Sequence, residues 1–151
     1  MDRFSPVDIL LVEDNPNDVE ITRRALEKSR LANRLYVARD GEEALKFLLE
    51  RNGDKAGSVP WPDLLLLDLN MPRMSGIEVL QRIKADDRLK RIPTIVLTVS
   101  EREEDVLRSY QLGANSYVTK PVSFDDFIKA VSALGEFWIV IARLPPKGFR
   151  N

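Results

Sequence analysis

The chain has 151 residues, 44% of them hydrophobic and 31% charged, which fits one compact domain and argues against both a disordered chain and a membrane protein. Its 23 basic and 24 acidic side chains nearly cancel, so no net field attracts nucleic acid or anionic lipid. The absence of cysteine and histidine excludes disulfides, thiolate and imidazole catalysis, and metal sites built on those side chains. Since the N-terminus also lacks the apolar stretch of a signal peptide, a cytoplasmic protein is expected.

Short apolar runs alternate with helical patterns along the chain. Nearly unbroken runs predict strands buried on both faces of a parallel sheet at 9–12, 64–67 and 94–97, and weaker strand candidates are 35–38 and 116–119. Between and after these runs, apolar residues recur at the spacing of helices: Ile77, Leu80 and Ile83, then Phe124, Phe127, Ile128, Val131 and Leu134. Two serines that precede an acid by three residues are typical of helix N-terminal caps: Ser75 with Glu78, and Ser123 with Asp126. The pattern is that of alternating strands and helices.

One connection between these elements is longer than usual. Residues 52–62 carry two glycines and two prolines, which predicts a surface loop before the third strand. Near its end, Trp61 is expected to cover the bottom of the sheet rather than to bind a partner.

Five strands that alternate with helices predict an α/β fold. We expect a doubly wound, five-stranded parallel sheet of flavodoxin-like order 2-1-3-4-5, with right-handed crossovers and helices on both faces. In such a sheet, ligands bind outside the carboxyl ends of strands one and three. The functional site is therefore expected at that edge.

Polar residues follow four of the predicted strands, at the point where each strand ends: Glu13, Asp14, Asp68, Thr98 and Lys120. An acid such as Asp14 is, by itself, typical of a helix cap. Three converging carboxylates without a histidine, however, would repel one another unless a cation lay between them, and hard oxygen ligands select Mg²⁺ or Mn²⁺. The pattern therefore predicts a divalent metal, bound directly by Asp14 and Asp68.

The segment Asp68-Leu69-Asn70-Met71-Pro72, taken with Asp14, Thr98 and Lys120-Pro121, resembles the receiver domain of bacterial response regulators. The resemblance extends from Val7 to about Leu134. It implies a two-component signalling switch rather than an enzyme: a partner histidine kinase transfers a phosphoryl group to the domain. The domain itself would catalyse only its own phosphorylation and dephosphorylation.

The resemblance also implies the roles of the acidic residues. Asp68 looks like the phosphoacceptor, whose carboxylate attacks phosphorus in line. Asp14 and the backbone carbonyl of Asn70 look like direct metal ligands. Glu13 stands where the family usually has an aspartate and would act through a metal-bound water.

Further residues resemble those that bind the phosphoryl group and relay its presence. Thr98 and Lys120 look like the pair that holds the phosphoryl oxygens. Tyr117 has the position of the aromatic residue that repacks when Thr98 shifts inward. Pro121 matches the position where receivers carry a cis peptide.

The C-terminal residues suggest how such a domain would act. We expect a receiver over residues 1–136 and an apolar extension over 137–151, with no effector domain and no direct DNA binding. The exposed apolar run favours a homodimer through the C-terminal region. This ending, the loop before Trp61 and the run at 114–117 resemble single-domain regulators paired with bacterial phytochrome kinases, which implies a bacteriophytochrome as the partner.

Three other functions fit the sequence less well than a receiver does. A phosphohydrolase of the haloacid dehalogenase type should have a second acid at position 70, where this chain has Asn70. An adaptor that works without phosphorylation would not need the complete acidic and basic set. A dinucleotide oxidoreductase should follow its first strand with a glycine-rich phosphate loop, whereas Glu13-Asp14-Asn15-Pro16 follows here.

Overall fold

A computed structural model describes residues 6–28, 33–49, 61–99, 103–120 and 125. The elements are β1 (Val7–Val12), α1 (Pro16–Lys28), β2 (Asn33–Ala38), α2 (Gly41–Leu49), β3 (Leu64–Asp68), α3 (Gly76–Ala85), the short 3-10 helix η2 (Leu89–Arg91), β4 (Thr94–Thr98), α4 (Glu103–Gln111) and β5 (Ser116–Thr119). Strands and helices alternate as the apolar runs predict. Apart from residue 125, the predicted helix at 124–134 lies outside the described residues, as do its cap at Ser123 and most of the loop 52–62.

The described strands form one parallel sheet in the order β2-β1-β3-β4-β5. This confirms the flavodoxin-like topology predicted from the sequence. In the register of the sheet, Val12 near the end of β1 lies opposite Leu67 of β3, and Asp68 lies opposite Leu97 of β4. The carboxyl ends of these strands therefore lie at one edge.

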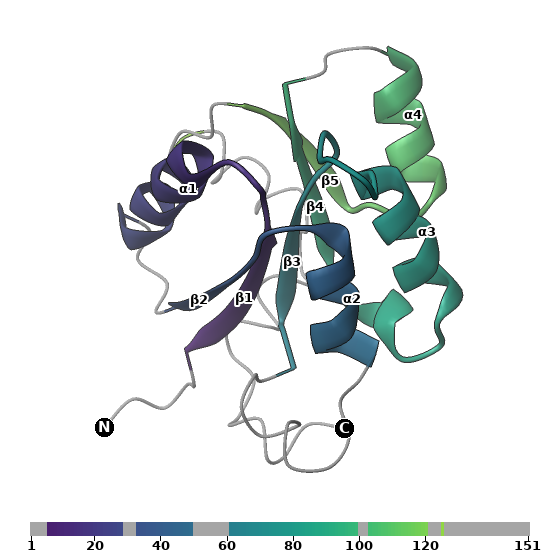
Figure 1. The fold of residues 1–151 in the computed structure, drawn as a ribbon, viewed down its shortest axis with the longest axis horizontal. Coiled ribbons are helices and arrows are strands. Elements are labelled where there is room, and N and C mark those ends of the chain that lie inside the picture. The colour runs from purple at the N-terminus through teal and green to yellow at the C-terminus, as the bar shows by residue number, and fades with distance from the viewer. Residues whose placement is uncertain (1–5, 29–32, 50–60, 100–102, 121–124, 126–151) are drawn as a thin grey trace.

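The sheet is buried on both faces because its strands are apolar at successive positions. Side chains alternate between the two faces of a strand, so Ile9 and Leu11 belong to one core cluster and Leu10 and Val12 to another. The first cluster packs against α1, and the second packs against α2 and α3. Figure 1 shows this arrangement, with α1 on one face of the sheet and α2, α3 and α4 on the other.

Two local predictions can be compared with the structure. The backbone N–H of Glu78 donates to Ser75 Oγ at 3.3 Å, so Ser75 caps α3 as predicted. Trp61 is half-buried and packs against the core cluster under α2 and α3, in agreement with the expected covering role.

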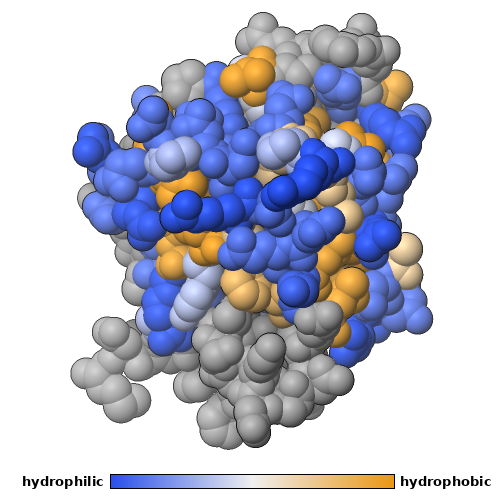
Figure 2. All heavy atoms as spheres, viewed as in Figure 1, coloured by the Kyte–Doolittle hydropathy of each residue, from blue (hydrophilic) through white to orange (hydrophobic). Residues whose placement is uncertain are grey.

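Hydrophilic residues dominate the face seen in Figure 2, with hydrophobic residues visible between them. Across the described residues, no helix has both the length and the apolar character needed to cross a membrane.

Gly76 brings the start of α3 directly against the end of β3. Its backbone N–H donates to the carbonyl of Leu69 at 2.9 Å. A Cβ atom at Gly76 would lie 2.1 Å from the carbonyl oxygen of Asp68 and 2.6 Å from Cα of Leu69. Only glycine allows so close an approach to backbone atoms, and this approach fixes α3 beside Asp68.

We predict that Gly76→Ala destabilises the protein by at least about 2 kcal/mol, because the added methyl group meets backbone that cannot move aside easily. The free energy of unfolding in urea measures this loss. Gln81→Ala, at an exposed position of the same helix, is the control and should change the stability by less than about 0.5 kcal/mol. Equal stabilities for the two variants would show that α3 does not depend on this contact.

Candidate functional site

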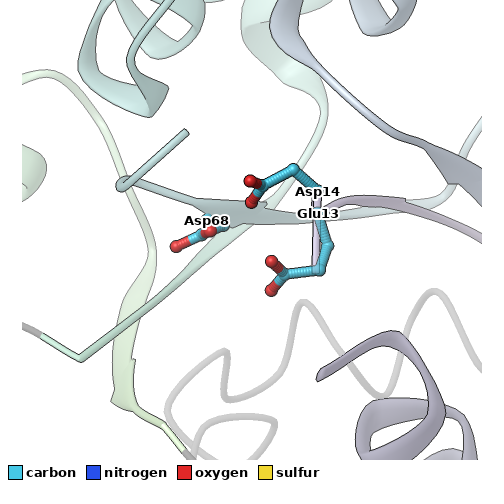
Figure 3. Close-up of side chains that lie close together, drawn as sticks. All are labelled: Glu13, Asp14 and Asp68. Atoms are coloured by element: carbon cyan, nitrogen blue, oxygen red, sulfur yellow. The ribbon is translucent and has the colours of Figure 1, made fainter. Parts of the chain in front are cut away.

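The carboxyl edge of the sheet brings together the polar residues that the sequence singled out. Glu13 and Asp14 follow β1, Asp68 ends β3, Thr98 ends β4 and Lys120 follows β5. One carboxylate oxygen from each of Glu13, Asp14 and Asp68 lies within 4.8 Å of the others. Figure 3 shows the three carboxylates gathered at the ends of their strands. We call Glu13, Asp14 and Asp68 the acidic cluster.

The ammonium group of Lys120 lies at the centre of the site. Its Nζ is 2.5 Å from Glu13 Oε1, 3.0 Å from Asp18 Oδ2 and 3.2 Å from Asp68 Oδ2. The side chain is only 8% exposed. Burial would lower the pKa of Lys120, but its hydrogen bonds to Glu13 and Asp18 and the charge of Asp68 raise it above the ordinary value, so the ammonium stays charged.

Burial makes the charged forms of Glu13 and Asp68 unfavourable and so raises the pKa of each. Burial, together with the charge of Asp68, raises the pKa of Glu13 to about 7, although the hydrogen bond to Lys120 opposes the rise. Burial also raises the pKa of Asp68 against the opposing effects of Lys120 and the Asn70 backbone. Both carboxylates are about 1% exposed, so water cannot compensate their charges. A cation placed among them would compensate these charges.

The residues fit a divalent cation by the chemistry of their donor set. Three carboxylates supply hard oxygen ligands at mutually short distances, and Asp14 is exposed, which leaves a side open to solvent. The oxygen that caps α1 belongs to Asn15: the N–H groups of Asn17 and Asp18 donate to Asn15 Oδ1 at 2.8 and 3.3 Å. The cap therefore does not occupy the Asp14 carboxylate.

A second group of contacts joins the loop after β3 to the end of β4. The amide nitrogen Nδ2 of Asn70 donates to Thr98 Oγ1 at 2.9 Å, and the Asn70 backbone N–H donates to Asp68 Oδ1 at 3.1 Å. The backbone N–H of Lys120 donates to the carbonyl of Thr98 at 2.8 Å. Thr98 is fully buried. Asp68 and Thr98 are thus held in place from the same loop.

Comparison with known proteins identifies the family to which this chain belongs. A family model described as the response regulator receiver domain matches residues 9–132. The chain belongs to the receiver family. This confirms the resemblance seen in the sequence and sets aside the haloacid dehalogenase and oxidoreductase alternatives.

Similar proteins place this receiver near phytochrome response regulators. Response regulator Rcp1 of Synechocystis sp. is 43% identical over 140 residues, covering 93% of this chain and 94% of Rcp1. The solved bacteriophytochrome response regulator AtBRR is 50% identical, with a TM-score of 0.74 over 87% of this chain and 94% of that chain. The phosphorylated cyanobacterial phytochrome response regulator RcpA is 41% identical, with a TM-score of 0.73 over 89% of this chain and 95% of that chain. Rcp1 has also been solved in an Mn(2+)-bound form, which has a TM-score of 0.71 over 88% of this chain and 94% of that chain.

Two contacts of the receiver site escaped the sequence analysis. The sequence does not point to Asp18, which bonds to Lys120. For Asn70 it predicts a metal-binding role of the backbone carbonyl, but it does not predict the side-chain contact with Thr98. Asp18 lies in the first turn of the helix that follows Asp14, and no pattern in the sequence distinguishes it from an ordinary acid at a helix start.

The remaining predicted positions lie around the site or beyond the described residues. Tyr117 is half-buried on β5 and packs against the core cluster under α2 and α3. Pro121 lies outside the described residues, so its predicted cis peptide stays a prediction.

We predict that the metal-free receiver loses stability as the pH rises from about 4.5 to about 7, the ordinary and the folded-state pKa of Glu13. In this window the folded protein retains a proton that the unfolded chain has already lost, so the free energy of unfolding falls as the pH rises. The loss is complete above pH 7 and has an upper limit of about 3 kcal/mol. Asp68, whose pKa is also raised, contributes with the same sign.

Urea unfolding in the presence of a chelator, from pH 4 to pH 8, measures this dependence. Glu13→Gln is the matched variant, because it retains the shape of the side chain and cannot ionise. Its stability should fall less over the same range. A wild-type profile identical to that of Glu13→Gln would contradict the assignment to Glu13.

Proposed function

We propose that this receiver is a metal-dependent switch that accepts a phosphoryl group on Asp68 from a partner histidine kinase. The observation that carries the proposal is the arrangement around Asp68, a buried carboxylate with an ammonium group 3.2 Å from one oxygen and the acidic cluster beside it. Such a site can hold a cation and a phosphoryl group side by side. The relatives of this chain among response regulators support the same function.

Asp68 is the nucleophile in this proposal. A bond forms between a carboxylate oxygen and phosphorus, the phosphorus–nitrogen bond of the kinase phosphohistidine breaks, and its electron pair leaves with the imidazole nitrogen. The Asn70 backbone N–H holds Asp68 Oδ1 and the Lys120 ammonium lies beside Oδ2, so the carboxylate is oriented before the donor arrives. Lys120 and the Thr98 hydroxyl then stabilise the charge on the phosphoryl oxygens.

The proposed cation is Mg²⁺, with Mn²⁺ as a substitute. Asp14 and Asp68 would bind it directly, with the backbone carbonyl of Asn70, and Glu13 would act through a metal-bound water. The chemistry that the cation supplies is neutralisation of the acidic cluster and of the incoming phosphoryl charge. The Mn(2+)-bound Rcp1 structure supports this choice.

In this proposal, phosphorylation changes the surface of the domain near α4 and β5. Tyr117 lies opposite Val96, two residues before Thr98 on the neighbouring strand, so it is on the same face of the sheet as Thr98. When Thr98 turns toward the phosphoryl group, Tyr117 can move into the space beside it, and the surface near α4 and β5 repacks. Response to a phytochrome kinase is proposed from the similarity to Rcp1, AtBRR and RcpA.

Several expectations from the sequence stay predictions. These are the division into a receiver (1–136) and an extension (137–151), the homodimer through the extension, the absence of direct DNA binding, and the cytoplasmic location. The residues that would carry the dimer lie outside the described residues.

We predict that acetyl phosphate and Mg²⁺ together add one phosphoryl group, stable in acid and labile in base, and that Asp68→Asn abolishes it. Intact-mass spectrometry and labelling measure the modification. Asp87→Asn removes the same charge at a side chain that is 95% exposed, and should be modified at the wild-type rate. If the Asp68→Asn variant were labelled as fast as wild type, the phosphoacceptor would lie elsewhere.

We predict that Asp14→Asn weakens Mg²⁺ binding at least about tenfold, because it removes a ligand charge from the acidic cluster. Glu13→Gln should weaken binding less, since Glu13 acts through water. Isothermal titration of the phosphate-free protein measures both affinities, with Asp87→Asn again as the control. Unchanged affinity in the Asp14→Asn variant would rule out this metal site.

A further inference from the structure

Lys120 has three carboxylate neighbours, and only two of them belong to the acidic cluster. Glu13 and Asp68 are members of that cluster, whereas Asp18 comes from the first turn of α1 and is not a member. The Lys120–Asp18 contact is a hydrogen bond of 3.0 Å between residues 102 positions apart in the chain. The Asp18 side chain is 26% exposed, so the contact is partly shielded from water.

A cation in the acidic cluster would compete with Lys120 for its acceptors. Glu13 Oε1 and Asp68 Oδ2 lie 2.5 and 3.2 Å from the ammonium, and both side chains also supply oxygens to the cluster. A divalent cation attracts these oxygens and repels the ammonium. Lys120 is almost fully buried, and a buried ammonium without an acceptor loses hydration that nothing replaces. Asp18 is the carboxylate neighbour of Lys120 that is not part of the acidic cluster, so it stays available to accept from the ammonium.

The backbone of Asp18 is itself fixed. Its N–H donates to the side chain of Asn15, the residue that caps α1, at 3.3 Å. Asp18 therefore presents its carboxylate to Lys120 from a capped helix end rather than from a loop. The position of the Asp18 backbone is therefore fixed before any ligand binds.

We propose that Asp18 is a positioning residue, which keeps the Lys120 ammonium beside Asp68 when the cation occupies the acidic cluster. The inference rests on the proposed function, since Lys120 must meet the incoming phosphoryl group. Asp18 does not contact that group. It retains one of the three ammonium hydrogens, so the others remain directed toward Asp68.

A purely structural role for the same contact is a clip between α1 and the end of β5. Such a clip would affect stability with or without metal, and its loss would not depend on what Lys120 does in the reaction. The positioning role instead predicts an effect that appears in the metal-loaded protein and disappears when Lys120 is absent. These two signatures separate the roles.

The first test measures phosphorylation by acetyl phosphate at saturating Mg²⁺. Asp18→Ala should lower the rate about tenfold, a loss of about 1.4 kcal/mol in transition-state stabilisation, while Asp18→Asn should recover part of it because the amide oxygen still accepts. Glu20→Ala is the matched control: it removes the same charge from the same helix, at an exposed residue whose ion pairs are with Arg23 and Arg24. In a Lys120→Met background, Asp18→Ala should have no further effect.

The second test follows the ammonium group itself and does not need phosphorylation. In the Mg²⁺-loaded wild type, the Lys120 ammonium should give an NMR signal protected from exchange with water, assigned by its loss in Lys120→Met. Asp18→Ala should lose this protection, and Glu20→Ala should retain it. In the metal-free protein, Glu13 still holds the ammonium, so the signal should survive in both variants.

The outcomes of the two tests are distinguishable. A protected ammonium in Mg²⁺-loaded Asp18→Ala, or an equal loss of rate with and without Lys120, would overturn the positioning role. If the wild type accepted no phosphoryl group at all, the proposed function would fail. The ammonium signal would then still decide whether Asp18 holds Lys120.

Discussion

The single positive charge of Lys120 among closely spaced carboxylates is the constraint on which the site depends. Glu13, Asp68 and Asp18 all approach its ammonium, and Asp14 adds a further negative charge at the open side. One ammonium cannot neutralise four carboxylates, and burial denies the inner two the help of water. The receiver site therefore has an excess of negative charge, which a divalent cation in the acidic cluster would compensate.

The parallel sheet is what allows such a concentration of charge. Residues that carry it are far apart in the chain, and the register between β1, β3, β4 and β5 brings their ends to one edge. A shift in register would move the polar residues at the strand ends into the buried core and disturb the packing on both faces. Close contact of Gly76 with the backbone of Asp68 adds a second restraint from α3. Packing on both faces of the sheet thus offsets the unfavourable free energy of the closely spaced, buried carboxylates.

Response to a ligand depends on contacts that can be exchanged. Asn70 joins Asp68 to Thr98 through its backbone and its side chain, and Thr98 in turn accepts the backbone N–H of Lys120. A hydroxyl can accept from Asn70 and donate to a phosphoryl oxygen at the same time. These contacts join Asp68 to the ends of β4 and β5, and Tyr117 of β5 packs against the core. These contacts offer a physical path from the site to the surface near α4.

The sequence by itself determined the strands, their parallel order and the residues that gather at the carboxyl edge. Apolar runs are local signals, and a polar residue directly after such a run must lie at the end of its strand, so Asp68, Thr98 and Lys120 could be placed without coordinates. Only the tertiary structure decided which side chains touch. It showed that Asn15 rather than Asp14 caps α1, that the Asn70 amide bonds to Thr98, and that Asp18 reaches Lys120. These contacts depend on the rotation of a helix and the path of a loop relative to the sheet, which no local pattern specifies.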